Sequence, residues 1–579
     1  MKVLLLFPPS WTPTMPHLAT PLLTAYLRAA GLDVVQRDLN LEFIDRLLTR
    51  EHLEWALAQL RRRQGRGGRG PRPPADLVDW ALAQGPDLAA QVEGAKDVIR
   101  SEAFYDGARS RPAMETITAA LQVASLPHYP SSVELSALAS GIPEDISAHL
   151  LAGARGAREN PYTRVFRRGL VDPLVAERPD LVGISVPSMG QFLAALTLAH
   201  LLREHGLRAH ITLGGPHITM LREAIVAVPA LFDLVDSAVV SAGEEPLLAL
   251  ARALEAGAPL STVPNLLYRQ ERTVVATPLG EAPPLEDAPL PDFDGLPLDR
   301  YLAPQRVLPL LTARGCYHGR CAFCNVGYGV GERFVQASAE KVVQQMLALR
   351  DRYGARHIFF ADEAITPRNL RGIATALAER DAGLHWVTCA RMERTLDGDL
   401  LALLARGGCR MLLYGLETAS PRVAAAMHKG TTVPEMSRVL REGAAAGIWN
   451  HVFFFFGFPG ETMEDAQATV NLLYSHADSI HSAALGTFLL ERYAPAERRP
   501  AEFGIRHIVP AGARDLAIYY DYQVAEGIDN ALAETIVERL MDALPDKTAP
   551  QFYMHDTYRF LYASRLHEEG KRYPTWLGG

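Results

Sequence analysis

The chain has 579 residues, too many for one hydrophobic core, so we expect about three or four compact units. Hydrophobic residues make up 48% and charged residues 21%, and the formal net charge of −8 gives no reason to expect a nucleic acid or an anionic membrane as partner. No apolar run is long enough to span a membrane, and the N-terminal MKVLLLF is too short for a signal peptide. The sequence therefore predicts a cytoplasmic protein with no membrane or nucleic-acid partner.

Short apolar strands alternate with helical stretches over residues 1–256. The predicted strands are Val3–Phe7, Val34–Arg37, Leu181–Val186, His210–Leu213 and Leu234–Val240. This alternation indicates a parallel sheet with helices on both faces, and five strands suit the α/β, flavodoxin-like (Rossmann-type) doubly wound fold. A long insertion at about residues 45–165, rich in Ala, Leu and Arg, is expected to be helical.

Two stretches of the first half have the composition of connecting segments. The run RRRQGRGGRGPRPP at 61–74 is a candidate RNA-binding patch, but its Gly and Pro content favours a solvated loop. Residues 257–305 are rich in Pro and Asp and are predicted to be a linker.

The alternation resumes after the linker. The predicted strands are Val307–Thr312, His357–Ala361, His385–Ala390, Arg410–Leu416, His451–Gly457 and Ala483–Leu489. Six such units predict a partial (β/α)6 barrel over residues 306–490. Residues 491–579 carry aromatic pairs at helical spacing, such as Tyr558 and Tyr562, and predict a small helical cap over the barrel mouth.

Three of the five cysteines fall within nine residues, in the segment RGCYHGRCAFCNVGYG at 314–329. The segment follows a predicted strand, so the thiols of Cys316, Cys321 and Cys324 belong to a loop at the C-terminal end of that strand, where α/β enzymes place their chemistry. In a reducing compartment such a group of thiols indicates a metal. Three thiolates can hold three irons of a 4Fe–4S cluster and leave the fourth iron open.

A structural zinc site is the alternative metal centre. It needs a fourth protein ligand, for which His318, Cys389 and Cys409 are the candidates. No second CxxC or HxxxH pair is present, which favours the cluster.

The segment CYHGRCAFC resembles the cluster motif of the radical S-adenosylmethionine (SAM) superfamily. Its CxxxxCxxC spacing has one residue more than the usual CxxxCxxC and resembles a variant found in cobalamin-dependent members. Three further segments resemble motifs of that family in the same order: FADEAITP at 360–367, YGLETASPRVAAAMHKG at 414–430 and FFFFGFPGET at 453–462. The resemblance covers residues 306–490.

The resemblance implies that SAM binds the open iron and that the reduced cluster cleaves SAM to a 5′-deoxyadenosyl radical, kept from water inside the barrel. The expected SAM contacts are Phe323 near the adenine, Glu363 and Glu417 at the ammonium or ribose, and Arg391 at the carboxylate. The alternative for the three charged residues is a surface salt bridge at a strand end, with Arg410 or Arg422 as partner of Glu417.

The first domain resembles the cobalamin-binding branch of the same superfamily. The matching segments are VGISVPS at 182–188, LGGPHIT at 213–219 and SAGEEPLLAL at 241–250, each at the C-terminal end of a predicted strand. The cobalamin contacts implied are Ser185, Gly214, Gly215, His217, Gly243 and Glu244. No Asp-x-His-x-x-Gly motif is present, so we expect cobalt without a histidine ligand.

Two alternatives remain open for this domain. His217 is either a corrin contact or a surface-loop histidine, and the domain as a whole can keep the fold without the cofactor.

Together these features predict a cobalamin-dependent radical SAM methyltransferase. The substrate would be an unactivated carbon of a natural product, a peptide or a tetrapyrrole-like molecule, with a flavodoxin or ferredoxin as electron donor. The alternatives are a non-methylating cyclase or rearrangement enzyme with the same cofactors and a non-catalytic cobalamin or cluster sensor. The motifs do not separate the first two, and they assign no catalytic residue.

Overall fold

The computed structural model describes residues 1–64, 71–331, 333–543 and 555–575. The described part of the chain divides into two compact units. The first unit comprises Met1–Pro283, Ala288–Pro304 and Gly512–Ala517. The second comprises Pro284–Asp287, Gln305–Ala511 and Ile518–Gly579, as far as these residues are described.

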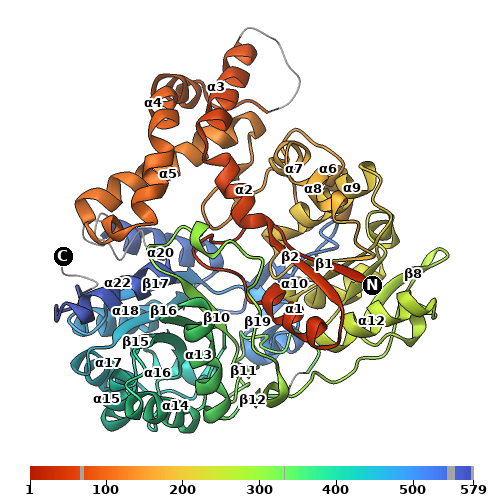
Figure 1. Ribbon diagram of the computed structural model, residues 1–579. Helices are drawn as coiled ribbons and strands as arrows, with labels where there is room; N and C mark the ends of the chain where they lie inside the picture. The colour runs from red at the N-terminus through yellow and green to blue at the C-terminus, as the bar shows by residue number, and fades with distance from the viewer. Residues whose placement is uncertain (65–70, 332, 544–554, 576–579) are drawn as a thin grey trace. The chain divides into compact units, whose positions relative to one another are not determined.

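The first unit is built on a sheet that has seven strands among the described residues, in the order β2-β1-β5-β6-β7-β8-β9 (Figure 1). Five of them are parallel: β1 (Lys2–Phe7), β2 (Asp33–Asp38), β5 (Leu181–Ser185), β6 (His210–Gly214) and β7 (Ser237–Val239). Counted along the chain, their order is the 2-1-3-4-5 of flavodoxin-like folds. The predicted fold class is therefore confirmed.

The segment predicted as a linker begins with a β-hairpin that extends this sheet. Strand β8 (Leu266–Gln270) pairs antiparallel with β7 and with β9 (Thr273–Ala276). Leu266 and Leu267 are buried in the sheet. The first half of residues 257–305 is thus part of the sheet; the Pro-rich composition obscured two strands of only five and four residues.

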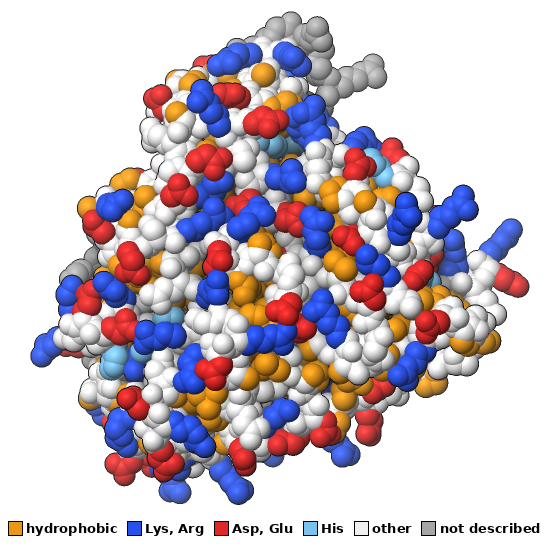
Figure 2. Space-filling view, viewed as in Figure 1, with side chains coloured by type: hydrophobic (Ala, Val, Ile, Leu, Met, Phe, Trp, Pro, Cys, Tyr) orange, Lys and Arg blue, Asp and Glu red, His pale blue; other side chains and the backbone are white. Residues whose placement is uncertain are grey.

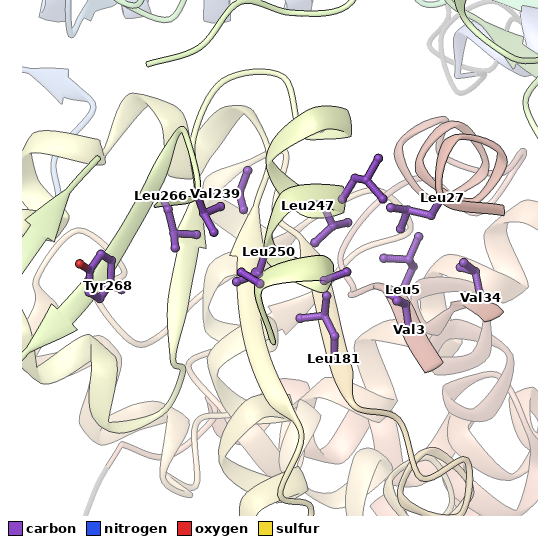
Figure 3. Packing of buried hydrophobic residues seen from close by; sticks show 14 residues of the cluster. Val3, Leu5, Leu27, Val34, Leu181, Val239, Leu247, Leu250, Leu266 and Tyr268 are labelled. Atoms are coloured by element: carbon purple, nitrogen blue, oxygen red, sulfur yellow. The ribbon is translucent and has the colours of Figure 1, made fainter. Parts of the chain in front are cut away.

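Helices α1 (Ala19–Ala29) and α12 (Glu244–Ala256) cover one face of the sheet. Figure 3 shows Leu27 of α1 and Leu247 of α12 facing Leu5 and Leu181 of the strands. The inner strands β1 and β5 are almost continuously apolar, as is typical of parallel strands that are buried on both faces. Burying each of these side chains contributes about 1.5–3 kcal/mol to folding.

The insertion after β2 is largely helical, as predicted. Its longest members are α3 (Arg50–Gln64), α4 (Ala75–Ile99) and α5 (Gly107–Ser125), which lie side by side in Figure 1. Part of the basic run 61–74 lies outside the described residues, so its interpretation stays a prediction.

The second unit contains a barrel sheet of six strands among the described residues, in chain order and all parallel. The strands are β10 (Val307–Leu310), β13 (His357–Phe360), β14 (His385–Ala390), β15 (Cys409–Glu417), β16 (Trp449–Phe456) and β17 (Ser482–Thr487). The intervening helices include α13 (Ala339–Tyr353), α14 (Pro367–Glu379), α15 (Gly398–Arg406), α17 (Val433–Ala445) and α18 (Met463–Ser475). This is the predicted partial (β/α)6 barrel.

Polar caps explain where the barrel helices begin. Ser338, Thr366, Asp397, Thr432 and Thr462 each accept a backbone N–H of the helix that follows. Such a cap stabilises a helix by about 0.5–2 kcal/mol and marks its first residue in the sequence.

The C-terminal region differs from the predicted cap in its position. Helix α22 (Asp556–Glu568) packs against the opposite end of the barrel, where the strands begin. Its Phe560 lies edge-on against His357, the first residue of β13, and its Glu568 lies 3.0 Å from Nε2 of His385, the first residue of β14. Helix α22 therefore closes the floor of the barrel and not its mouth.

The mouth is covered instead by other elements of the same region. Helix α20 (Asn530–Ala543) contacts Gly457, directly after β16, through Ala533. Two-stranded pairs precede it, and they were not predicted: β18 (Leu490–Glu491) with β20 (Tyr519–Tyr520), and β19 (Ile505–Ile508) with β21 (Tyr522–Val524). Strands of two to four residues leave no alternating pattern in a sequence.

Charged side chains of both signs are interspersed over the face shown in Figure 2, with apolar side chains between them. No helix among the described residues is both long enough and apolar enough to cross a bilayer.

Candidate metal centre and cofactor sites

The loop that carries the three cysteines is closed at its base by a short hairpin. Strand β11 (Ala313–Arg314) pairs antiparallel with β12 (Val335–Gln336), so the residues between them project from the C-terminal end of β10. Cys316, Cys321 and Cys324 are all half-buried on this loop. The structure thus places the predicted ligands at the barrel mouth.

The loop turns sharply at two glycines. Gly315 has φ +74° and Gly319 has φ +57°, where a β-carbon would lie 3.2 Å from the carbonyl oxygen of Cys316. A left-handed backbone favours glycine at both positions. These turns keep the three cysteines within one compact loop.

The protein environment acts on the thiols in two opposing ways. Burial raises the pKa of Cys321, while the cations of Lys429 and Arg391 lower it. Burial also raises the pKa of Cys324 to about 12, with the neighbouring Cys321 adding to the effect. Thiols of this kind ionise when they bind a metal, whose charge replaces the proton.

The donor set fits an iron–sulfur cluster held by three thiolates. No three His, Cys, Asp or Glu side chains among the described residues converge on the position of a single metal ion. The fit therefore rests on three half-buried thiols within nine residues of one loop.

The three residues considered as fourth ligand of a zinc site lie on different elements of the second unit. Cys409 is fully buried at the start of β15, at the other end of the barrel from the loop. The Nε2 of His318 lies 2.7 Å from the carbonyl oxygen of His428 and can only donate to it. Cys389 lies within β14.

A four-residue segment, Met427–Gly430, organises the cluster loop. The carbonyl oxygen of Met427 accepts the amide of Ala322 at 2.9 Å, and that of His428 accepts the His318 ring. The carbonyl oxygen of Lys429 accepts Nη2 of Arg391 at 2.6 Å. Three successive carbonyls thus tie the cluster loop and the end of β14 to one turn, which we call the 427–430 turn. The resemblance marked this segment but assigned it no role.

The predicted SAM contact Glu417 is paired with a residue that the sequence did not single out. Its Oε1 lies 2.9 Å from Nζ of Lys429, with side-chain exposures of 12% and 8%. Arg410 and Arg422, the partners considered from the sequence, bond elsewhere: Arg410 donates to Nδ1 of His385 and Arg422 pairs with Asp465. Lys429 follows Glu417 by twelve residues in the chain. Helix α16 (Pro421–Ala426) lies between them and reverses the direction of the chain, which brings the ammonium of Lys429 next to the carboxylate of Glu417.

Two acidic residues, Asp362 and Glu363, follow β13, and their side chains have different surroundings. Asp362 is buried and accepts the Thr312 amide at 2.7 Å, the Thr312 hydroxyl at 2.6 Å and the Ala313 amide at 2.9 Å. It thereby joins the ends of β13 and β10. Glu363 is exposed, and no hydrogen bond to it is found among the described residues. Of the two carboxylates, Glu363 is the one free to bind a ligand.

The remaining predicted SAM contacts lie beside the same cluster loop. Phe323 packs edge-on against Phe455 with ring centroids 5.1 Å apart, and Nζ of Lys429 lies 5.8 Å from the Phe323 centroid. The Arg391 side chain is only 9% exposed. Its Nε lies 3.8 Å from Oε2 of Glu393, so the strand-end salt bridge considered from the sequence stays open beside a SAM contact.

In the first unit, the predicted cobalamin contacts lie along one edge of the sheet. Ser185 ends β5 and pairs in register with Gly214, which ends β6. Gly243 and Glu244 follow β7 at the start of α12, where Glu244 is buried. The C-terminal ends of parallel strands are where this fold binds ligands.

Two of these residues are explained by the fold itself. Gly215 has φ +108°, and a β-carbon there would lie 2.7 Å from the carbonyl oxygen of Val186. His217 is buried against Phe192, with 2% exposure, so it is not a surface-loop histidine. Its Nε2 has no hydrogen-bond partner among the described residues.

Part of the chain is similar in sequence to known proteins. Residues 310–473 match the family model of the Radical SAM superfamily. A relative from Pyrococcus horikoshii, named an uncharacterized methyltransferase, is 29% identical over 300 residues, which cover 50% of this chain and 63% of the relative. The matched part thus spans less than two thirds of that relative.

Two solved structures share the fold of the chain. TsrM, a radical SAM methyltransferase from Kitasatospora setae solved with cobalamin and a [4Fe-4S] cluster, aligns with a TM-score of 0.58 at 16% identity over 98% of this chain and 99% of that chain. OxsB, a cobalamin-dependent SAM radical enzyme solved with aqua-cobalamin, aligns with a TM-score of 0.54 at 18% identity over 68% of this chain and 64% of that chain. Residues 310–473 thus match the family model of the Radical SAM superfamily, and the chain is similar in fold to these two solved structures.

Proposed function

We propose that the chain is a cobalamin-dependent radical SAM methyltransferase that acts on an unactivated carbon of a natural product, a peptide or a tetrapyrrole-like molecule. The observation that carries the proposal is the loop of Cys316, Cys321 and Cys324 at the mouth of a radical SAM barrel. The solved structures that share its fold hold cobalamin, and one of them also holds a [4Fe-4S] cluster. The relative from Pyrococcus horikoshii is named a methyltransferase.

When bound, the cluster and SAM would supply a radical that abstracts hydrogen, and cobalamin would carry the methyl group. The protein residues would bind and orient these groups. Glu363, which is exposed and makes no hydrogen bond within the described part of the chain, and Oε2 of Glu417 offer carboxylate acceptors for the SAM ammonium or ribose hydroxyls. Phe323 offers an aromatic face beside the cluster loop, and Arg391 a guanidinium at its edge.

For cobalamin, the supporting feature is the edge formed by Ser185, Gly214, Gly215, Gly243 and Glu244. The unpartnered Nε2 of His217 offers a polar contact at the same edge. Cobalt without a histidine ligand remains our expectation, and the electron donor is proposed to be a flavodoxin or ferredoxin.

The proposal is tested by anaerobic purification with cobalamin supplied, followed by iron and cobalamin assays, SAM turnover and product mass. We expect a full cluster, bound cobalamin, 5′-deoxyadenosine and a product heavier by one methylene. A product of unchanged carbon count would favour a cyclase or rearrangement enzyme. Absence of 5′-deoxyadenosine from fully loaded protein would favour a sensor.

A further inference from the structure

The strand order 2-1-3-4-5 of the first unit has a topological switch point between β1 and β5. Crossover connections are right-handed, so α1 leaves β1 toward one face of the sheet and α9 (Phe192–Glu204) leaves β5 toward the other. The loops that follow the two strands therefore part at the C-terminal strand ends, where doubly wound sheets bind their ligands. The cobalamin contacts predicted from the sequence include Ser185 of β5 but no residue of the loop after β1, residues 8–18.

The loop after β1 is held from two sides by buried amide side chains. Oδ1 of Asn40 accepts the Trp11 amide at 2.9 Å, and Nδ2 of Asn40 donates to the Trp11 carbonyl at 2.9 Å. Nε2 of Gln191, in the loop after β5, donates to the Pro8 carbonyl at 2.8 Å. Asn40 and Gln191 are both buried. The side chains of the loop thus have fixed positions beside the switch point.

Two aromatic side chains position the ring of His17 on this loop. The ring stacks on Phe7, the last residue of β1, with centroids 4.5 Å apart and an angle of 9° between the ring planes. Trp11 lies edge-on against the same ring, with centroids 5.2 Å apart. Phe7 is fully buried, whereas His17 and Trp11 are half-buried. Both loop residues therefore keep accessible surface next to the C-terminal end of β1.

The backbone determines which nitrogen of His17 carries the proton. Nδ1 lies 3.2 Å from the amide nitrogen of Ala19, the first residue of α1. A backbone amide can only donate, so Nδ1 is the acceptor and bears no proton. The bond also satisfies an amide of the first helical turn, which has no partner within the helix. Burial lowers the pKa of His17 to about 4, so the ring is neutral at pH 7 and its one proton resides on Nε2.

The Nε2–H group of His17 is available to a ligand. No hydrogen bond to it is found within the described part of the chain. Nε2 is also not one of the fully enclosed polar atoms that lack a partner, so solvent or a ligand reaches it. A ring nitrogen that carries a proton has no lone pair to offer to a metal. His17 can therefore donate a hydrogen bond to a ligand but cannot bind its metal.

Cobalamin has acceptors that match this donor. The rim of its corrin ring carries primary amides, whose carbonyl oxygens accept hydrogen bonds. A second polar atom that lacks a partner among the described residues, Nε2 of His217, belongs to the same edge of the sheet, where His217 is 2% exposed. Two ring nitrogens at the C-terminal strand ends are thus left for a ligand that presents several polar groups.

We propose that His17 donates a hydrogen bond from Nε2 to a side-chain amide of cobalamin bound at the switch point, and that its Nδ1 bond to Ala19 prevents it from binding the cobalt. The inference rests on the proposed function, because it concerns the cofactor named there. It adds a contact from the loop after β1 and gives a structural reason why this histidine is not a cobalt ligand.

The tautomer is tested by two-bond proton–nitrogen NMR on the full chain with 15N-labelled histidine. The His17 signals are assigned by their loss in His17→Asn. We expect the Nε2–H tautomer, with no change between pH 6 and pH 8. An Nδ1–H tautomer, or titration of the ring in this range, would overturn the proposal.

The contact is tested by titrating the full chain with hydroxocobalamin. His17→Asn keeps an acceptor for the Ala19 amide, but its shorter side chain has no donor at the position of Nε2. His17→Phe keeps a ring against Phe7 and also lacks the donor. We expect both variants to bind hydroxocobalamin about fivefold more weakly than the wild type, the ratio that one hydrogen bond supplies.

His205→Asn is the matched control. His205 follows the last turn of α9, at the opposite edge of the sheet, and its Nδ1 lies 2.8 Å from Asp172. Its replacement should leave the affinity unchanged. Wild-type affinity in His17→Phe would show that the ring and not its donor matters, and would overturn the proposal. If His17→Phe fails to fold because the bond to Ala19 is lost, His17→Asn and the NMR of the loaded chain decide.

The NMR spectrum of the chain loaded with hydroxocobalamin tests the hydrogen bond itself. The Nε2–H signal of His17 should persist and exchange with solvent more slowly than in the free chain. Loss of this proton on loading would mean that Nε2 binds cobalt. Unchanged exchange would mean that no ligand atom covers it, and either result would overturn the proposal.

These measurements need no SAM turnover, so failure of the inference is distinguishable from failure of the proposed function. A wild-type chain that binds hydroxocobalamin no better than both His17 variants rejects the inference and leaves the proposed function intact. A wild-type chain that binds no hydroxocobalamin rejects both the inference and the assignment of cobalamin to this protein.

Discussion

The ammonium of Lys429 lies 2.9 Å from Oε1 of Glu417, and both side chains are nearly buried. A β-carbon on Gly415 would lie 2.7 Å from the same ammonium, so the absent side chain at Gly415 makes room for the pair. The carboxylate indicated by the sequence as a SAM contact is therefore already charge-compensated, while its Oε2 makes no hydrogen bond among the described residues.

Glu417→Gln should weaken SAM binding by about 1–3 kcal/mol, the range for a hydrogen bond to a charged group. The amide replaces one acceptor oxygen by a donor and removes the charge that attracts an ammonium. Isothermal titration with SAM measures the change, and the visible spectrum of the cluster should stay that of the wild type. Unchanged affinity with a lowered melting temperature would show that Glu417 serves the fold alone.

The same pair should show strong coupling in a double-mutant cycle. Glu417→Gln alone leaves Lys429 buried without its partner and should destabilise the fold by about 3–5 kcal/mol. Adding Lys429→Met should recover part of this loss, because the uncompensated charge is removed. Urea unfolding of the two single variants and the double variant gives the coupling. Additive losses would mean that the ion pair contributes nothing to folding.

The 427–430 turn should be sensitive to a side chain at Gly430. Its φ is +70°, and a β-carbon would lie 3.1 Å from Cε1 of His318. Gly430→Ala should cost about 1–2 kcal/mol for the left-handed backbone and should also displace His318 from the cluster loop. Gly383→Ala is the matched control, with φ +63° and no atom within 4 Å of the new β-carbon.

The iron content of the two variants distinguishes the strain of the left-handed backbone from the displacement of His318. Both variants should lose similar stability, but only Gly430→Ala should lower the iron content after reconstitution. Equal iron content in the two variants would mean that the 427–430 turn does not support the cluster.

The stability of the first unit should depend on the protonation of Glu144. This residue is 7% exposed, its Oε2 has no partner among the described residues, and burial raises its pKa to about 8 from an ordinary 4.5. Between these values the folded state keeps a proton that the unfolded state has lost. Stability therefore falls as pH rises from 4.5 to 8, by about 1.4 kcal/mol per pH unit for this group.

Glu144→Gln should remove this slope, so the variant should be more stable than the wild type at pH 8 and equal to it near pH 4.5. Denaturant unfolding at several pH values measures the difference. Glu134→Gln, an exposed carboxylate of the same insertion, should leave the slope unchanged. A wild-type slope retained in Glu144→Gln would show that this carboxyl is ionised in the folded state.

The sequence predicted the two parallel sheets because short apolar strands, three to nine residues long in the structure, alternate with helical stretches along the chain. It failed where strands lie within a Pro-rich segment, where strands have only two to four residues, and where the end of the barrel that a helix covers had to be known. The β8–β9 hairpin has strands of five and four residues within a Pro-rich segment. The apolar pattern of α22 showed that the helix is buried, but periodicity does not say which end of a barrel it covers.

At the candidate site, too, the sequence identified some of the residues and missed others. Cys316, Cys321, Cys324 and Glu417 carry chemistry in their own side chains and are recognisable by spacing. Lys429 contributes through a side chain placed by a reversal of the chain, and through a backbone carbonyl that any residue possesses. Neither feature leaves a signal in a single sequence.

Iron content and 5′-deoxyadenosine formation, measured together on the reconstituted chain, test the central claim most directly. The wild type should hold a full 4Fe–4S cluster and cleave SAM, and so should Cys409→Ala, whose thiol is fully buried at the far end of β15. The variant with Ala at Cys316, Cys321 and Cys324 together should lose both properties. A triple variant that kept its iron and still cleaved SAM would contradict the account.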